Sequence, residues 1–326
     1  MKNLKNIIGL FSDNTFSLKF RIIYYVILVT FFGSCQKELK LNFDSSAIKQ
    51  VLIANFTANN YLYLSISKSK QPDDFNPVEF LKNNKVDLYE NDVFIETLPY
   101  ILKDTLSGLG YYTSSFKLRE NKTYKVVSKH IELGDAIAEE YLPPYPTNSL
   151  QVTLLQHADT VQPNVRGKYM LTFQDSSNAK NYYTVAVFYK AIKVVVDSNG
   201  VSSNKTDYLY NVPSYNAEVP NYSNYYKSFF TDASFNGQLK SYVFDFSSEY
   251  DNYFTDLYNF YKEIFLIVEF NAAGPGHYSW YYQQLPRGDN TFNDGQNERI
   301  NISSNIQNGY GHFSGFSPSY TTLRIK

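Results

Sequence analysis

The feature that most restricts the fold is a two-residue alternation of apolar and polar side chains along much of the chain. Within residues 61–67, Leu62, Leu64 and Ile66 fall on one side of an extended strand. A sheet with one face in a core and the other in water requires this pattern. With 326 residues, 43% of them hydrophobic, the chain can fill more than one such core.

Turn signals between the alternating segments indicate antiparallel pairing. Residues 86–90 and 93–98 bracket Asn91 and Asp92, which both tolerate positive φ. This arrangement predicts a tight hairpin. With the neighbouring alternating segments, it predicts an immunoglobulin-like β-sandwich over residues 47–142.

A proline cluster separates this region from the rest of the chain. Pro143, Pro144 and Pro146 fix φ, lack backbone donors and cannot occupy a central strand. We therefore place a domain boundary there. Because alternating segments resume beyond the prolines, residues 143–326 are predicted to form a second β-rich domain, which makes the whole chain mainly β.

One segment of the second domain has helical rather than extended spacing. From Ser248 onward the larger apolar and aromatic residues recur at intervals of three and four, and Ser248 with Asp251 resembles a capping box. This spacing predicts one amphipathic helix near residues 249–264.

Residues 1–34 have the pattern of a signal peptide. Basic residues precede an apolar run at residues 22–32, which at about 1.5 Å per residue is too short to cross a hydrocarbon core of about 30 Å as a helix. Small residues then precede Cys35, the single cysteine of the chain. This arrangement resembles the lipobox of bacterial lipoproteins, in which the cysteine is acylated, for example with palmitate. The alternative is a free thiol.

The residues after Cys35 indicate where the protein would face. Gln36, Lys37 and Glu38 are similar to the export signal that surface lipoproteins of the Bacteroidota carry behind the acylated cysteine. They imply an outer-membrane protein that faces the cell exterior. The alternative is an ordinary polar tether, and residues 35–46 are expected to act as a tether.

The sequence contains no recognisable catalytic or metal-binding motif. The histidines are scattered and there is no paired-cysteine motif, so we predict no metal and no cofactor. A serine-hydrolase pentapeptide is also missing, since Gly315-Phe316-Ser317-Pro318-Ser319 fails at its last position. The net charge of −1 excludes a basic surface for nucleic acid. These observations favour a non-enzymatic protein.

Aromatic residues are the remaining functional signal. The chain has 31 Tyr, 25 Phe and one Trp. Such rings favour strands for packing reasons, and they also form binding surfaces because tyrosine combines a rigid apolar face with a polar tip. We expect loops at residues 274–282 and 305–316 to be a partner-binding surface, because both are more apolar than turns need to be. The candidate binding residues are Tyr278, Trp280, Tyr281, Tyr282, Tyr310, Phe313 and Phe316.

The end of the chain carries a family resemblance. The stretch SNIQNGYGHFSGFS at residues 304–317 resembles the closing motif of a lipoprotein family of the Bacteroidota, the domain-of-unknown-function family 4249. Residues 51–56 and 65–69 look like the family's first two strands, and residues 232–237 look like its mid-chain turn. The chain departs from the family where Asn290-Thr291-Phe292 replaces the usual Asn-Pro-Phe.

The resemblance implies a partner. Members of this family are often encoded beside TonB-dependent receptors, which implies capture or uptake at the cell surface. The expected function is a cell-surface lipoprotein that binds a ligand or partner together with an outer-membrane TonB-dependent transporter. The alternatives are a degradative accessory hydrolase of the same uptake system and a structural subunit of an outer-membrane complex.

Overall fold

A computed structural model describes residues 48–71, 74–105, 108–146, 150–156, 166–177, 180–209, 214–216, 219, 221–222, 227–247, 261–283 and 304–326. Ala47–Lys326 forms one compact unit. Within these described ranges no helix has both the length and the apolar character needed to span a membrane. The leader, Cys35, Gln36, Lys37 and Glu38 lie outside the described residues, so the expectations about them remain predictions.

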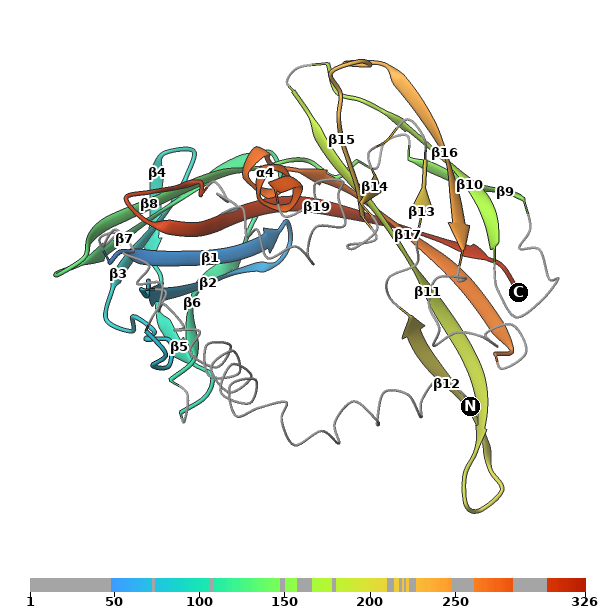
Figure 1. Cartoon of the computed structure of the whole chain (residues 1–326), viewed down its shortest axis with the longest axis horizontal. Helices are drawn as coiled ribbons and strands as arrows, with labels where there is room; N and C mark the ends of the chain where they lie inside the picture. Colours follow the sequence, from blue (N-terminus) through green and yellow to red (C-terminus); the bar gives the residue numbers. More distant parts are fainter. Residues whose placement is uncertain are drawn as a thin grey trace, which may run out of the picture. The chain divides into compact units, whose positions relative to one another are not determined.

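The largest sheet combines strands from the beginning and the end of the described chain (Figure 1). In spatial order it contains β14 (Asn221–Tyr222), β15 (Lys227–Thr231), β11 (Tyr182–Val196), β17 (Glu263–Ala273), β19 (Tyr310–Arg324), β1 (Gln50–Thr57), β2 (Tyr61–Lys68), β6 (Gly110–Lys117) and β5 (Tyr100–Leu102), and β12 (Ser202–Leu209) also pairs with β11. Strands β1 and β19 run parallel, from Val51 opposite Tyr310 to Thr57 opposite Phe316. The last strand therefore lies beside the first.

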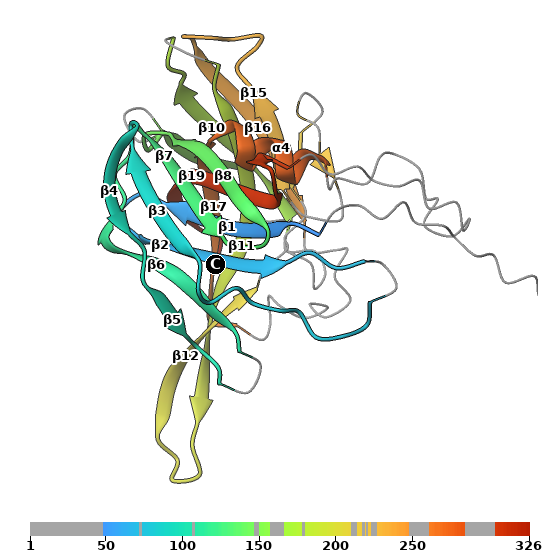
Figure 2. The ribbon, with the colours of Figure 1, turned by 90° about the vertical axis from the view of Figure 1, so that its left-hand side faces the viewer.

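Two smaller sheets and one helix complete the described elements (Figure 2). One sheet contains β18 (Ile306–Gln307), β8 (Gly134–Leu142), β7 (Lys122–His130), β3 (Lys85–Glu90) and β4 (Val93–Thr97). The other contains β13 (Ser214–Tyr215), β16 (Leu239–Ser247), β10 (Arg166–Gln174) and β9 (Gln151–Gln156). The described helix is α4 (Pro275–Gln283).

Each smaller sheet shares a hydrophobic core with part of the large sheet. The first core unites buried residues of β1, β2 and β6 with those of β3, β7 and β8. The second unites β11, β15 and β17 with β10 and β16, and it is rich in rings such as Phe173 and Phe270, whose centroids are 4.7 Å apart. Strand β19 serves both, because Phe313 belongs to the first core and Leu323 packs against the second.

Much of the strand prediction is confirmed. The chain is mainly β, and Asn91 and Asp92 connect β3 with β4 at positive φ angles of 48° and 63°. The immunoglobulin-like connection of the first strands and the domain bounds remain predictions. Ile306 and Phe313 pack with residues that precede Pro143, a long-range contact that alternation alone does not indicate.

The helix prediction requires a correction. Residues 248–260 lie outside the described residues. The predicted helix near 249–264 is wrong at its end, because Glu263 and Ile264 open β17 and Ile264 is fully buried in the second core. Burial against a neighbouring sheet overrides the three-and-four spacing there. The described helix, α4, instead covers a segment that we expected to be a loop.

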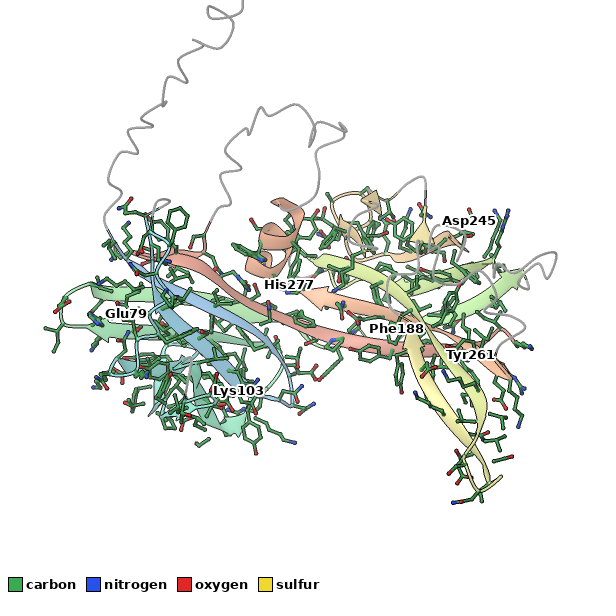
Figure 3. All side chains as sticks on the ribbon, turned by 60° about the horizontal axis from the view of Figure 1, so that its bottom comes forward. Glu79, Lys103, Phe188, Asp245, Tyr261 and His277 are labelled. Atoms are coloured by element: carbon green, nitrogen blue, oxygen red, sulfur yellow. The ribbon has the colours of Figure 1, made fainter. Side chains whose placement is uncertain are left out.

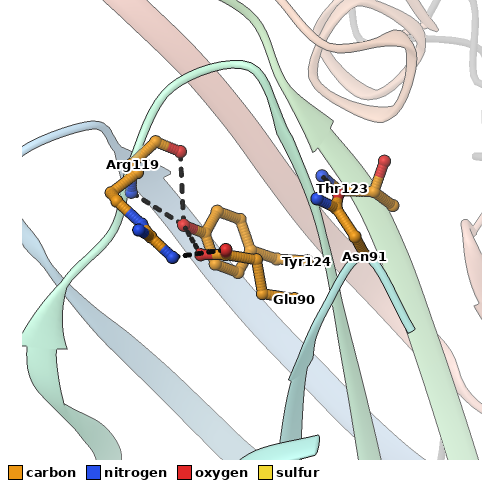
Figure 4. A network of polar contacts seen from close by, with 5 residues as sticks. All are labelled: Glu90, Asn91, Arg119, Thr123 and Tyr124. Carbon is orange, nitrogen blue, oxygen red and sulfur yellow. Dashed lines mark hydrogen bonds and ion pairs between the residues drawn. The ribbon is translucent and has the colours of Figure 1, made fainter. Parts of the chain in front are cut away.

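Polar groups at the edge of the first core form a network that joins Glu90 of β3 with Arg119 and with Tyr124 of β7 (Figure 4). The Tyr124 hydroxyl accepts from the Arg119 amide at 2.7 Å and donates to Glu90 Oε2 at 3.0 Å. Arg119 Nη2 donates to Glu90 Oε1 at 2.5 Å. Burial raises the pKa of Tyr124 to about 12, so the hydroxyl keeps its proton and remains a donor. The network lets a tyrosine ring fill the core without an unpaired oxygen.

Candidate functional site

Helix α4 begins at a Gly-Pro-Gly sequence that we expected to form a turn. Pro275 occupies the first helical position, where its missing N–H costs no hydrogen bond. The Gly274 amide donates to the Gly315 carbonyl of β19 at 2.8 Å, and the Tyr278 amide donates to the Gly274 carbonyl at 3.0 Å. The expectation of a turn-rich loop at residues 274–282 is therefore wrong, since a proline at this position starts a helix as readily as it makes a turn.

A buried carboxyl lies at the start of α4. Glu140 projects from β8 and is 2% exposed. A side chain at Gly274 or Gly276 would overlap its carboxyl group, so both glycines are needed for the close approach. Burial raises the pKa of Glu140 to about 8, although the amides of Gly276, Tyr141 and His277 favour the charged form. The carboxyl therefore carries a proton at neutral pH.

Two buried histidines, one in α4 and one in β19, pack against aromatic rings. His277, labelled in Figure 3, belongs to α4. Its ring centroid is 4.7 Å from that of Tyr281 and 4.5 Å from that of Phe316. His312 of β19 stacks on Trp280, with centroids 4.2 Å apart and ring planes at 26°. We call the group formed by Glu140, His277, Trp280, Tyr281, His312 and Phe316 the α4 cluster.

Both histidines are neutral at neutral pH. Burial, with smaller contributions from the charges of Lys227 and His312, lowers the pKa of His277 to about 3. Burial alone lowers the pKa of His312 to about 4. Among the described residues, neither ring has a hydrogen-bond partner on either nitrogen. The α4 cluster is therefore an uncharged unit held by ring packing. No group of three metal-ligating side chains occurs in the described part of the chain.

The closing motif positions β19 beneath α4. Asn305 clamps the backbone of Phe313, donating from Nδ2 to the carbonyl at 2.7 Å and accepting from the amide at 2.9 Å. Asn308 turns the chain at a φ of 57°. Gly311 has a φ of 107°, and a side chain there would collide with the Leu52 carbonyl of β1. The motif thus performs a structural task, the parallel pairing of β19 with β1.

The predicted binding aromatics have different environments. Phe313 is fully buried and packs on Phe56 at 4.6 Å, so it belongs to the core. Tyr310 is exposed, whereas the side chain of Tyr282 lies outside the described residues. The half-buried members are Tyr278, Trp280, Tyr281 and Phe316. Three of the seven, Trp280, Tyr281 and Phe316, contact the rings of His277 and His312. No local sequence signal identifies Glu140 as their neighbour.

The mid-chain turn has a structural explanation as well. Asp232 accepts from the Asn181 amide at 3.0 Å, and Asp175 accepts from the Gly237 amide at 2.7 Å. Gly237 has a φ of 72°, which favours glycine. Asp175 also accepts from the Tyr183 hydroxyl at 2.5 Å. Asp175 and Asp232 therefore stabilise the connection from β15 to β16 through these hydrogen bonds.

The opposed titrations of the α4 cluster give a testable pH dependence. A histidine whose folded pKa lies below 6.5 stabilises the fold above pH 6.5 and loses that contribution as pH falls. Glu140 behaves oppositely, since its raised pKa favours the fold below 4.5 and the contribution is lost as pH rises toward 8. Between pH 7 and pH 5 the histidines and Glu140 therefore offset one another.

We expect Glu140→Gln to expose the acid sensitivity of the histidines. At pH 5 each buried neutral histidine costs about 2 kcal/mol relative to pH 7, at 1.36 kcal/mol per pKa unit. The variant should lose about 4 kcal/mol of unfolding free energy between these pH values, and the wild type much less. Urea unfolding at both pH values measures the difference. Equal pH dependence of the two proteins would contradict this account of the cluster.

Comparison with known proteins gives one family. The family model described as a domain of unknown function (DUF4249) matches residues 36–322. The match includes β1, α4, most of β19 and every residue of the α4 cluster. Comparison with curated proteins gives no match.

Proposed function

Since the chain belongs to the DUF4249 family, we propose that it is a non-enzymatic lipoprotein of the outer membrane that binds a ligand or partner together with a TonB-dependent transporter at the cell surface. The lipobox-like sequence before Cys35 supports the anchor. The family match supports it too, because it begins at Gln36, directly after that cysteine.

The observation that carries the non-enzymatic part of the proposal is the state of the α4 cluster. A general acid or base must reach the substrate and exchange protons with it. Glu140, His277 and His312 are 2%, 2% and 7% exposed, and at neutral pH all three are uncharged. Buried neutral groups of this kind support packing, and this favours a binding protein over the degradative hydrolase.

The binding surface that we propose is the aromatic side of α4 together with Tyr310. Trp280 and Tyr281 are half-buried. Trp280 packs on His312 of β19, and the Tyr281 hydroxyl is hydrogen-bonded to Asn55 of β1. Tyr310 is exposed at the start of β19. Aromatic rings fixed by packing lose little conformational entropy on binding, and such anchors commonly dominate an interface.

Affinity purification of tagged variants from native membranes tests this surface. If Trp280 is a central anchor, Trp280→Ala should cost about 2 kcal/mol in binding, roughly a thirtyfold loss. Recovery of a TonB-dependent receptor should fall accordingly. Trp280→Phe is the matched control, because it keeps a ring on His312.

Tyr310→Ala should also lower receptor recovery, because Tyr310 is 36% exposed at the start of β19. Circular dichroism and thermal melting establish that each variant is folded. Folded Trp280→Ala and Tyr310→Ala proteins that retain the receptor at wild-type levels would remove this surface from the proposal.

A further inference from the structure

Two apolar side chains are far more exposed than the others in the described part of the chain. Phe75 is 94% exposed and Ile131 is 103% exposed, whereas the next large hydrophobic side chain, Val93, is 63% exposed. Single exposed apolar residues are common on protein surfaces and need no explanation. Their position in the fold decides whether these two have a role.

Both side chains lie at the end of the sheets where β1 begins. Phe75 is in the connection between β2 and β3. This connection lies beside the start of β1, because the Ser69 amide donates to the Lys49 carbonyl at 2.8 Å. Ile131 is in the turn between β7 and β8. This turn also lies beside the start of β1, because Gln50 Nε2 donates to the Gly134 carbonyl at 2.5 Å. Figure 3 labels Glu79 at this end, and Figure 2 views the molecule from this side.

We call this region the entry end and define it as residues 48–50, 69–71, 74–79 and 130–134. It also exposes Ile48 and Val78, at 44% and 50%. Its apolar residues therefore come from three separate segments of the chain. A membrane surface can meet several such loop tips at once, whereas a small ligand would need a cavity.

Local hydrogen bonds hold the two tips in defined conformations. In the first, the Asn76 amide donates to Asp74 Oδ1 at 2.9 Å. In the second, His130 Nδ1 accepts from the amides of Glu132 and Leu133, both at 3.1 Å. The exposed side chains are thus presented by ordered turns, which reduces the conformational entropy lost on docking.

The first tip carries one more acidic than basic residue, with Asp73, Asp74 and Glu79 against Lys68 and Lys70. Lys68 and Glu79 approach to 3.7 Å, and Lys70 and Asp74 approach to 4.0 Å. The tip has no excess of basic side chains that would require an anionic surface. Its attraction to a membrane would come from burial of apolar area, which salt does not screen.

The segment between the predicted anchor and the compact unit is short. Eleven residues lie between Cys35 and Ala47, where the compact unit begins, and a chain of that length spans at most about 40 Å. We propose that the entry end docks onto the lipid surface, with Phe75 and Ile131 inserted into it. The assignment of this end to the membrane rests on the proposed anchor at Cys35, whereas insertion itself can be measured without the lipid.

A chain of residues 36–326 provides that measurement. It retains the compact unit with both cores, and it contains neither the apolar run nor any cysteine. An Ile131→Cys variant can therefore be labelled at one site with a polarity-sensitive dye. Val196→Cys is the matched control, because Val196 is 60% exposed at the end of β11, next to the turn that leads to β12.

With vesicles of phosphatidylcholine and phosphatidylethanolamine, the dye at position 131 should shift to the blue, and the dye at position 196 should not. The shift should persist in high salt. Phe75→Asp should weaken vesicle binding of the labelled protein about tenfold or more, because an inserting ring is replaced by a charge.

Several results would overturn the proposal. The first is that the emission of the dye at position 131 does not shift, and the second is that it shifts equally at both positions. The third is that the emission at position 131 shifts with protein concentration when no vesicles are present. The last would identify the entry end as a contact between copies of the chain. None of these results alters fatty-acid attachment at Cys35, so failure of the docking proposal is distinguishable from failure of the proposed anchor.

Discussion

Replacement of Cys35 by alanine should abolish lipid attachment and release the protein from the outer-membrane fraction. The thiol is the only group in the lipobox-like sequence that can accept the acyl-bearing group, so the expected loss of labelling is complete. Metabolic labelling with a fatty acid, followed by fractionation of the cells, measures both effects.

A neighbouring substitution provides the control for this experiment. Ser34→Ala keeps a small residue before the cysteine, as signal-peptide cleavage requires, and should be labelled like the wild type. Equal labelling of the wild type and Cys35→Ala would refute the anchor, and the free-thiol interpretation of Cys35 would then be preferred.

The second large effect is expected at Phe313. Its ring is fully buried beside Phe56 in the first core, on the strand that also reaches the second core. Phe313→Ala removes a large buried ring and leaves a cavity, which typically costs about 3–5 kcal/mol of unfolding free energy. Urea unfolding at neutral pH measures the loss.

Tyr310→Ala is the matched control for Phe313→Ala. It truncates an aromatic ring on the same strand, but Tyr310 is 36% exposed whereas Phe313 is fully buried, so the expected loss is smaller, about 1–2 kcal/mol. If Phe313→Ala is as stable as Tyr310→Ala, Phe313 is not a core residue and the sequence-based assignment to a binding surface would regain support.

The strands could be predicted because their causes are local. Alternation of Leu62, Leu64 and Ile66 reflects one buried face, and all three are buried in the first core. The turn at Asn91 and Asp92 follows from residues that tolerate positive φ. The partners of these strands are not local, and the parallel pairing of β1 with β19 has no signal in either segment.

The candidate site could be predicted only in part. The sequence shows that aromatic residues are concentrated around Trp280 and Tyr310. It does not show which of them are buried, because their burial depends on the packing of β8, β19 and α4 against one another. Glu140 lies in no motif and far from His312 in the sequence, and the closing motif that contains His312 does not indicate that its ring stacks on Trp280. Phe313 was misassigned because a glycine-rich motif resembles an exposed loop, whereas its glycines permit close packing of strands.

The most direct test of the central claim is purification of the wild-type protein from native membranes after mild chemical cross-linking. The account predicts that the recovered chain is acylated at Cys35 and is cross-linked to a TonB-dependent receptor, and both can be identified by mass spectrometry. The proposed partnership would be contradicted if the acylated chain were recovered without any receptor. It would also be contradicted if an unrelated lipoprotein, purified in the same way, recovered the receptor in equal amounts.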